Sequence, residues 1–133
     1  MKLLKLHVAK LLDKGYLVIY KTSNDLISDL REIPFNNNYV LEDLLINCDL
    51  LIIDDLGAEQ VTDFSTNELF NLINKKLLNN KKMIISTNLN LPDIEKTYTT
   101  RIYSRLVGNF KLLKFYGDDV RIKLNLARMR NQQ

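Results

Sequence analysis

The chain has 133 residues, of which 46% are hydrophobic, so it suits one domain with a core and is too short for two comfortable ones. Its lone cysteine, Cys48, excludes an internal disulfide and a cysteine-built zinc site, and no apolar run reaches the roughly 20 residues of a membrane-spanning helix. The net charge is +3, and the charged side chains are unevenly distributed, because residues 101–133 hold eight basic and two acidic ones. This basic end indicates contacts with phosphate or nucleic acid; a solvated basic surface is the alternative. Because no targeting signal pattern opens the chain, we expect a cytoplasmic protein.

The first predicted elements are a helix, a strand and a second helix. Apolar residues spaced as on one helix face predict an amphipathic helix over residues 2–14. The aromatic and β-branched run at residues 16–22 predicts a strand. Ser23 is a favourable N-cap for the second helix, and Pro34 predicts that this helix ends near residue 31.

The middle of the chain continues this alternation. A short helix is expected over residues 41–47, and the apolar run at residues 49–54 has the length of a strand. Ser65, with Glu68 three residues later, forms the sequence pattern of a capping box. We therefore expect Ser65 or Thr66 to cap a helix that ends at about residue 79.

The last third of the chain adds two more predicted strands. Residues 82–86 predict a strand, and after a loop we expect a helix over residues 98–107 that Gly108 ends. Residues 110–116 predict another strand, and Gly117 turns the chain into a C-terminal segment that we expect to be helical. Because the strands are continuous apolar runs that alternate with helices, the sequence predicts an α/β fold with a parallel sheet covered on both faces.

Polar side chains follow two of the predicted strands, and in parallel sheets function collects at these strand ends. Asp54 and Asp55 come directly after an apolar run, and such a pair can hold Mg²⁺ and orient a water for phosphoryl transfer, or simply cap the next loop. Asn88 follows the strand at residues 82–86, where an amide can hydrogen-bond a phosphate or make a turn.

Three arginines follow these strands. Arg101 and Arg105 lie four residues apart, on one face of the predicted helix, and Arg121 follows the strand at residues 110–116. Arginine binds phosphate with two parallel hydrogen bonds, so each residue is a candidate phosphate ligand. A solvated surface arginine is the alternative for each of them.

The joint pattern resembles a known family over essentially the whole chain. The stretches that carry the resemblance are residues 47–57 (NCDLLIIDDLG), 86–88, 101–109 (RIYSRLVGN) and 117–123 (GDDVRIK). They resemble the AAA+ ATPase domain of the bacterial DnaC/DnaI helicase loaders, and IstB-type transposition ATPases are near relatives. The resemblance implies a P-loop NTPase-like, three-layer fold. It also implies ATP and Mg²⁺ as cofactors, spiral self-association, contact with single-stranded DNA and delivery of the replicative DNA helicase.

The resemblance also implies a role for each matched residue. Asp54 matches the Walker B acid that holds Mg²⁺, and Asp55 stands where many AAA+ proteins have the catalytic glutamate. Asn88 matches the sensor that contacts the γ-phosphate. Arg105 matches the arginine finger offered to a neighbouring subunit, and Arg121 matches the second sensor arginine, which contacts phosphates of its own subunit.

The sequence departs from this family at the phosphate-binding loop. The family carries G-x-x-x-x-G-K-[ST], whereas none of the four glycines here is followed by Lys-Ser or Lys-Thr. We therefore expect residues 1–133 to form a single partial AAA+ domain that lacks the first strand, this loop and the helicase-binding N-terminal region. A truncated gene, an internal start or a cloned fragment would each give such a chain. We expect it to bind no nucleotide tightly and to hydrolyse no ATP alone.

Two other functions fit the same residues. One is a non-enzymatic AAA+ remnant that acts as an interaction module, and the other is an IstB-type transposition helper ATPase. Residues 104–109 (SRLVGN) favour the loader over the transposition helper.

The missing first strand also has a consequence for the sheet. In proteins of this kind the strands run in the order 5-1-4-3-2, so loss of the first strand leaves an unpaired edge beside residues 82–86. We expect either that residues 110–116 move beside residues 82–86, which gives the order 5-4-3-2, or that two chains join. Self-association is expected in addition.

Overall fold

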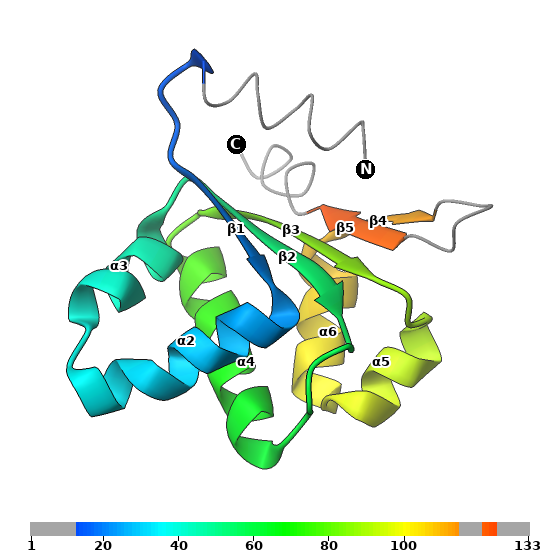
Figure 1. Cartoon of the computed structure of the whole chain (residues 1–133). Helices are drawn as coiled ribbons and strands as arrows, with labels where there is room; N and C mark the ends of the chain where they lie inside the picture. The colour runs from blue at the N-terminus through cyan, green and yellow to red at the C-terminus, as the bar shows by residue number, and fades with distance from the viewer. Residues whose placement is uncertain (1–12, 115–120, 125–133) are drawn as a thin grey trace.

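A five-stranded sheet organises residues 13–114 and 121–124, which are the residues that the computed structural model describes (Figure 1). The strands are β1 (Val18–Thr22), β2 (Leu50–Leu56), β3 (Lys82–Thr87), β4 (Lys111–Lys114) and β5 (Arg121–Leu124). Their order is β1-β2-β3-β5-β4, with β1, β2 and β3 parallel and β5 antiparallel to both of its neighbours. The predicted α/β fold is confirmed, with a parallel sheet over these three strands.

The described helices all lie on one side of this sheet (Figure 1). They are α2 (Ser23–Asn36), α3 (Tyr39–Asn47), α4 (Asp63–Leu78), α5 (Leu91–Thr97) and α6 (Thr100–Asn109). Alternate residues of β2 and β3, such as Leu51, Ile53 and Ile85, belong to the core and are 0% exposed. Burial of each such side chain stabilises the fold by about 1.5–3 kcal/mol. Within residues 13–114 and 121–124, no helix is long and apolar enough to cross a membrane.

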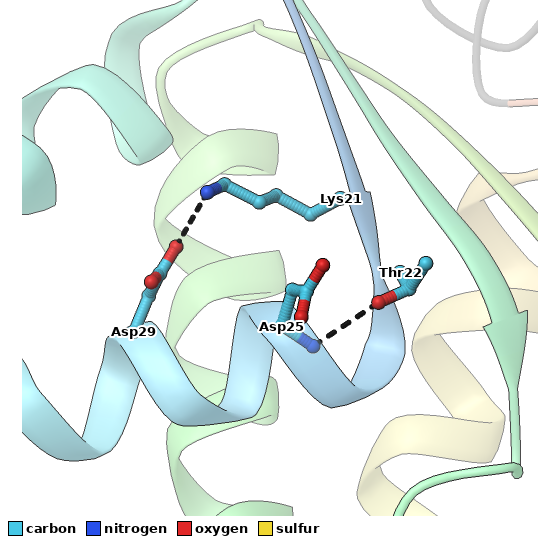
Figure 2. A network of polar contacts seen from close by, with 4 residues as sticks. All are labelled: Lys21, Thr22, Asp25 and Asp29. Atoms are coloured by element: carbon cyan, nitrogen blue, oxygen red, sulfur yellow. Dashed lines mark hydrogen bonds and ion pairs between the residues drawn. The ribbon is translucent and has the colours of Figure 1, made fainter.

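Thr22 caps α2, whereas the sequence predicted Ser23 as the cap. The backbone of Thr22 is extended, and its Oγ1 accepts a hydrogen bond of 3.2 Å from the Asp25 N–H (Figure 2). Lys21 and Asp29 form an ion pair of 2.9 Å that links β1 to α2 (Figure 2). Because the cap is also the last residue of β1, the strand passes into the helix without a loop.

The prediction that Pro34 ends α2 early is wrong, because the helix runs to Asn36. Proline disrupts a helix through its missing N–H and through the clash of its ring with the carbonyl four residues earlier, here that of Leu30. Pro34 lies in the last turn, so the helix loses little beyond one hydrogen bond. Asn37 then ends the helix in the left-handed conformation (φ 50°), and its N–H donates to the Ile33 carbonyl.

The capping box of α4 has different members from those predicted. Thr62 is the N-cap, and the Thr62 and Ser65 side chains accept from each other's backbone N–H groups at 3.1 and 2.8 Å. The predicted pair of Ser65 and Glu68 is wrong, because α4 begins at Asp63 and Ser65 is already its third residue. A serine hydroxyl thus takes the place that glutamate or glutamine has in the usual pattern.

Residues 91–97 form α5, where the sequence predicted a loop. The Asn90 side chain caps this helix by accepting from the Asp93 N–H, and Pro92 lies in the first turn, where its missing N–H has no helical partner to lose. The next helix, α6, contains Gly108, which was expected to end it.

The C-terminal part of the sheet differs most from the prediction. Residues 121–124 form β5 where a helix was expected, and β5 pairs with β3 while β4 lies on the far side of β5. The prediction that residues 110–116 pair with residues 82–86 is therefore wrong. The buried strand β3 needs backbone partners on both sides, and an antiparallel strand supplies them as well as a parallel one. The predicted helix over residues 2–14 lies almost wholly outside the described residues.

A buried lysine anchors the segment that leads into β2. The Lys76 side chain is 0% exposed, and its Nζ donates to the carbonyls of Leu45 and Ile46 at 3.0 Å and of Cys48 at 3.3 Å. These carbonyls belong to the end of α3, where a positive charge is favourable. Burial lowers the pKa of Lys76 below its ordinary value. The contact ties α4 to α3 and so fixes the point at which β2 enters the sheet.

Candidate functional site

Three polar side chains from neighbouring strands form a row near the carboxyl ends of β1, β2 and β3. Asp54 of β2 accepts hydrogen bonds on both carboxylate oxygens, from the Tyr20 hydroxyl of β1 and from the Ser86 hydroxyl of β3. Ile53 and Ile85 face the helices, and neighbouring residues of a strand point to opposite faces. The row therefore lies on the sheet face that is turned away from the described helices.

The two hydroxyl groups that hold Asp54 differ in exposure. Ser86 is 4% exposed, and its Oγ also accepts the Asp55 N–H at 3.0 Å, so it is fixed from two sides. Tyr20 is 53% exposed. Its hydrogen bond to Asp54, with some desolvation, raises the pKa of Tyr20 to about 12, so the phenol is a donor at neutral pH. Asp54 Oδ1 thus faces a buried partner and Oδ2 faces a solvent-exposed one.

Asp55 lies beside this row at an irregularity of β2, where the register against β3 shifts between Ile53 and Leu56. Its φ of 59° lies in the left-handed region, which aspartate adopts more readily than most residues. Its carbonyl accepts the Ser23 hydroxyl at 2.9 Å and the Ala58 N–H at 3.1 Å. The surrounding contacts hold this strained backbone, as is common at functional sites. The Asp55 side chain is exposed, and it is available to solvent and ligands.

Asn88 lies at the same edge of the sheet as the two aspartates. It follows β3 directly and is exposed. The Thr87 hydroxyl donates to the Leu56 carbonyl at 2.6 Å and accepts the Leu89 N–H at 3.1 Å, which ties the ends of β2 and β3 together. Gly57 closes the turn after β2 with a φ of 106°, and a Cβ there would lie 2.8 Å from Leu89 Cδ1. The predicted grouping of Asn88 with the aspartates at one sheet edge thus agrees with the structure.

A buried carboxylate links this edge to the helix that carries the arginines. Glu59 is 6% exposed, and its two oxygens accept the Gly57 N–H at 2.8 Å and the Tyr98 hydroxyl at 2.5 Å. Burial and the bond to Glu59 raise the pKa of Tyr98 above its ordinary value. Tyr98 directly precedes Thr99, the N-cap of α6. The loop after β2 and the start of α6 are therefore joined through one buried hydrogen bond.

Arg101 and Arg105 lie on one face of α6, as predicted, and this face meets α4. Their guanidinium carbons lie 4.3 and 5.9 Å from the centre of the Phe70 ring, and Arg101 also donates to Asn67 Oδ1 at 3.3 Å. Such a contact contributes about 0.5–1 kcal/mol at an exposed site. Both arginines are exposed. The helix α6 lies on the helix side of the sheet (Figure 1). Asp54 lies on the opposite face, because its neighbour Ile53 belongs to the core, so Arg105 and Asp54 of the same chain are on different sides of the sheet.

Arg121 is the first residue of β5. Its Cα pairs with that of Thr87 in β3 and with that of Lys114 in β4. The register therefore places the Arg121 backbone next to the last residue of β3, at the edge that carries Asn88. The sequence predicted this residue after the last strand, whereas the structure places it within a strand.

The two aspartates fit a magnesium ion that is shared with a phosphate ligand. Among the described residues, no group of three His, Cys, Asp or Glu side chains could hold a metal ion unaided. Mg²⁺, however, usually keeps several waters and takes one or two carboxylates together with phosphate oxygens. Each Asp54 oxygen accepts one hydrogen bond and retains a further lone pair, and Asp55 is exposed beside it.

A pocket of about 300 Å³ lies beside α5, and it includes none of these aspartates. It is lined mostly by leucine and proline side chains from residues 89–92 and 112–114. An apolar lining offers few donors to a phosphate, so we place no phosphate ligand in this pocket.

Two contacts of the site were missed by sequence reasoning. Tyr20 was assigned only to a strand, and the Glu59–Tyr98 pair was not identified. A tyrosine near the end of a strand is a weak signal, because its cross-strand partner depends on a register that the sequence does not state. The Glu59–Tyr98 pair joins residues 39 positions apart through two loops, and no local pattern predicts it.

Comparison with known sequences places the chain among ATP-binding proteins. The family model described as IstB-like ATP binding protein matches residues 5–127. The chromosomal replication initiator proteins DnaA of Campylobacter jejuni strains 81-176 and RM1221 are each 36% identical to this chain over 95 residues. These residues are 71% of this chain and 21% of each relative, so the chain spans about a fifth of their length.

Solved structures of DnaA share the fold. AMPPCP-bound DnaA from Aquifex aeolicus matches with a TM-score of 0.64 and 22% identity over 72% of this chain and 30% of that one. The replication initiator DnaA bound to AMPPCP and single-stranded DNA matches with a TM-score of 0.65 and 22% identity over 75% of this chain and 31% of that one. The fold thus corresponds to part of the DnaA AAA+ domain. Because the family model covers most of its length, the chain belongs to the IstB-like ATP-binding protein family.

Proposed function

We propose that this chain is part of a DNA-replication AAA+ ATPase domain of the helicase-loader type. The observation that carries the proposal is the cluster of Asp54, Asp55 and Asn88 at the carboxyl edge of a parallel sheet in an IstB-like chain. Ligands of parallel α/β sheets bind at this edge. The relation to DnaA supports a role in replication.

The polar residues of the edge have distinct proposed roles. Asp54, held by Ser86, provides the carboxylate that binds Mg²⁺ of an ATP complex. Mg²⁺, when bound, supplies positive charge that neutralises the phosphate oxygens during phosphoryl transfer. Asp55, exposed beside it, orients the attacking water, and Asn88 hydrogen-bonds the terminal phosphate.

The two arginines have proposed roles in different subunits. Arg105 is exposed on the helix side of the sheet and away from Asp54, so we assign it to the nucleotide of a neighbouring subunit, as an arginine finger. Arg121 begins β5 next to the end of β3, and we assign it to phosphates bound by its own subunit. These assignments imply that chains of this protein associate with one another.

The absence of a P-loop sequence limits what the chain does by itself. Backbone N–H groups and a lysine of that loop normally hold the phosphates, and no such motif is present in these 133 residues. We propose that the chain alone neither binds ATP tightly nor hydrolyses it. Its proposed partners are the replicative DNA helicase, single-stranded DNA and further copies of itself, in the cytoplasm.

The subunit assignments are tested in a version of the chain that is extended by a family first strand and P-loop. An Arg105→Ala subunit lacks the finger, and an Asp54→Ala subunit lacks the Mg²⁺ ligand, so each is expected to be inactive alone. Mixed together, they form some interfaces in which an intact Asp54 site faces an intact Arg105. We expect ATP hydrolysis to return on mixing and to peak near equal amounts.

Arg101→Ala is the matched control for this experiment. Its side chain is bound to Asn67 and Phe70 of its own chain, so its loss is expected to leave most of the hydrolysis. If no ratio of the two inactive subunits restores hydrolysis, Arg105 does not act in a neighbouring subunit and the assembly proposal fails.

A second candidate function is that of an IstB-type transposition helper ATPase, which the matching family description favours. Sedimentation of the full-length gene product, in place of the extended chain, with the replicative helicase of its source organism separates the two candidates, because the loaders bind the helicase through their N-terminal region. A stable complex supports the loader. Binding to a transposase in place of the helicase supports the helper.

A further inference from the structure

Tyr20 is an unusual residue for its position on the sheet. It is a large aromatic side chain that is 53% exposed, yet its hydroxyl is directed inward to Asp54 Oδ2. Its neighbour Lys21 is bound to Asp29 of α2, on the helix side (Figure 2). Tyr20 thus lies on the opposite face of β1, with its hydroxyl at the carboxylate.

The two partners of Asp54 differ in how easily each one can leave. Ser86 is buried and also holds the Asp55 N–H at 3.0 Å, so its hydroxyl cannot move without disturbing the strand ends. Tyr20 is exposed, and within the described part of the chain its hydroxyl has one hydrogen bond, to Asp54, so rotation of the side chain into solvent breaks that bond. A cation that arrives from solvent therefore meets Oδ2 and the Tyr20 hydroxyl first.

We propose that Tyr20 is a positioning residue that competes with a divalent cation for Asp54 Oδ2, holding the carboxylate when no cation is bound and leaving when one binds. This inference rests on the proposed role of Asp54 as a cation ligand. An oxygen that accepts a hydrogen bond from the phenol has one lone pair fewer to offer a cation. Ser86 keeps Oδ1 in place in both states, so the carboxylate stays aimed at the sheet edge while its partner changes.

The test is Mn²⁺ binding to the full chain, followed by electron paramagnetic resonance of the free ion. We expect Tyr20→Phe to bind Mn²⁺ about 3- to 10-fold more tightly than the wild type, because it removes one net hydrogen bond that competes with the ion. Tyr16→Phe is the matched control, since Tyr16 is similarly exposed at 47% and precedes the same strand. We expect this control to bind like the wild type.

The outcomes separate this inference from the proposed function on which it rests. Unchanged or weaker binding by Tyr20→Phe overturns the competition. Asp54→Asn is expected to abolish binding, and if it binds Mn²⁺ like the wild type, the ion is not at Asp54 and the proposed cation role fails.

A measurement on the wild-type chain covers the case in which Tyr20→Phe does not fold. In protein labelled with ¹³C at the tyrosine Cζ, Mg²⁺ is expected to shift the Tyr20 signal, assigned by through-bond correlation, and to leave that of Tyr16 in place. A Tyr20 signal that stays fixed while Mg²⁺ saturates the site contradicts the displacement.

Discussion

Removal of a single hydroxyl, in Tyr98→Phe, tests whether the buried pair with Glu59 holds the site edge to α6. Glu59 is 6% exposed and Tyr98 is 7% exposed, and the hydroxyl lies 2.5 Å from Glu59 Oε2. Without it, that oxygen remains buried and keeps no other hydrogen bond to the residues that the structure describes, while Oε1 retains the Gly57 N–H. Hydrogen bonds to charged groups contribute about 1.5–3 kcal/mol, so we expect the free energy of unfolding to fall by about that amount.

This change is large enough to measure by thermal and urea unfolding. With about 2.1 cal/mol/K of unfolding entropy per residue, a chain of this size loses about 3–4 °C of Tm per kcal/mol, so Tyr98→Phe is expected to lower Tm by about 5–10 °C. Tyr103→Phe is the matched control, because Tyr103 is half-buried on α6 and is expected to change stability by less than about 0.5 kcal/mol. If Tyr98→Phe is no more destabilising than Tyr103→Phe, the pair does not hold the edge.

The same pair predicts a dependence on pH. Because the folded state raises the pKa of Tyr98, the folded chain keeps the phenol proton at a pH where the unfolded chain loses it. The stability from Tyr98 is therefore fully present below its ordinary pKa of about 10 and is lost as the pH rises above that value, by at most about 1.4 kcal/mol per pH unit. We expect the difference in unfolding free energy between the wild type and Tyr98→Phe to shrink between about pH 9 and pH 11. A difference that stays constant over this range contradicts the reasoning.

Three further predictions follow from the turn after β2, the missing P-loop and the basic end. Gly57→Ala is expected to destabilise the fold by about 1–3 kcal/mol in urea unfolding, because the φ of Gly57 is +106° and a Cβ there would lie 2.8 Å from Leu89. Gly108→Ala is expected to stabilise the fold by about 0.5–1 kcal/mol, because Gly108 lies within α6 and an added Cβ would meet no atom of another described element within 4 Å. Titration with a fluorescent ATP analogue is expected to give no saturable binding below about 1 mM, and a micromolar affinity that Asp54→Ala abolishes would contradict the account. Residues 101–133 hold eight basic side chains, and we expect single-stranded DNA binding through them to weaken steeply between about 50 and about 200 mM salt. Binding that does not depend on salt, or no binding at low salt, would mean that this segment is a solvated surface.

The alternation of helices and strands could be predicted because the apolar pattern is strong and local. The runs at residues 49–54 and 82–86 lie at the centre of a parallel sheet, and residues such as Ile53 and Ile85 are fully buried as their pattern indicates. The same logic placed Asp54 and Asn88 at one sheet edge, because parallel strands end on the same side.

The errors at helix ends have a common physical reason. Several residues near each end can cap a helix or break it, and the tertiary structure decides among them. Thr22, and not Ser23, caps α2 because the helix starts directly at the end of β1. Pro34 is accommodated because α2 ends two residues later, before the missing hydrogen bond affects a further turn.

The sheet edge and the site contacts needed information that the local sequence does not hold. The pairing of β5 with β3 depends on which strand reaches the open edge of β3, and the four residues 121–124 carry no pattern that selects it. The contact of Tyr20 with Asp54 depends on the register of β1 against β2. A shift of one residue would turn Tyr20 to the other face.

The central claim is that a cation binds at the carboxyl edge of β2 and β3, and line broadening by Mn²⁺ in an amide NMR spectrum tests it most directly. We expect the amides of Asp54, Asp55 and Asn88 to lose intensity first. Leu50 and Lys82 begin the same strands, about 13 Å farther along, and their amides are expected to lose intensity only at higher Mn²⁺. Asp54→Asn is expected to abolish the effect. Broadening that is centred on another part of the chain, or that survives Asp54→Asn, contradicts the account.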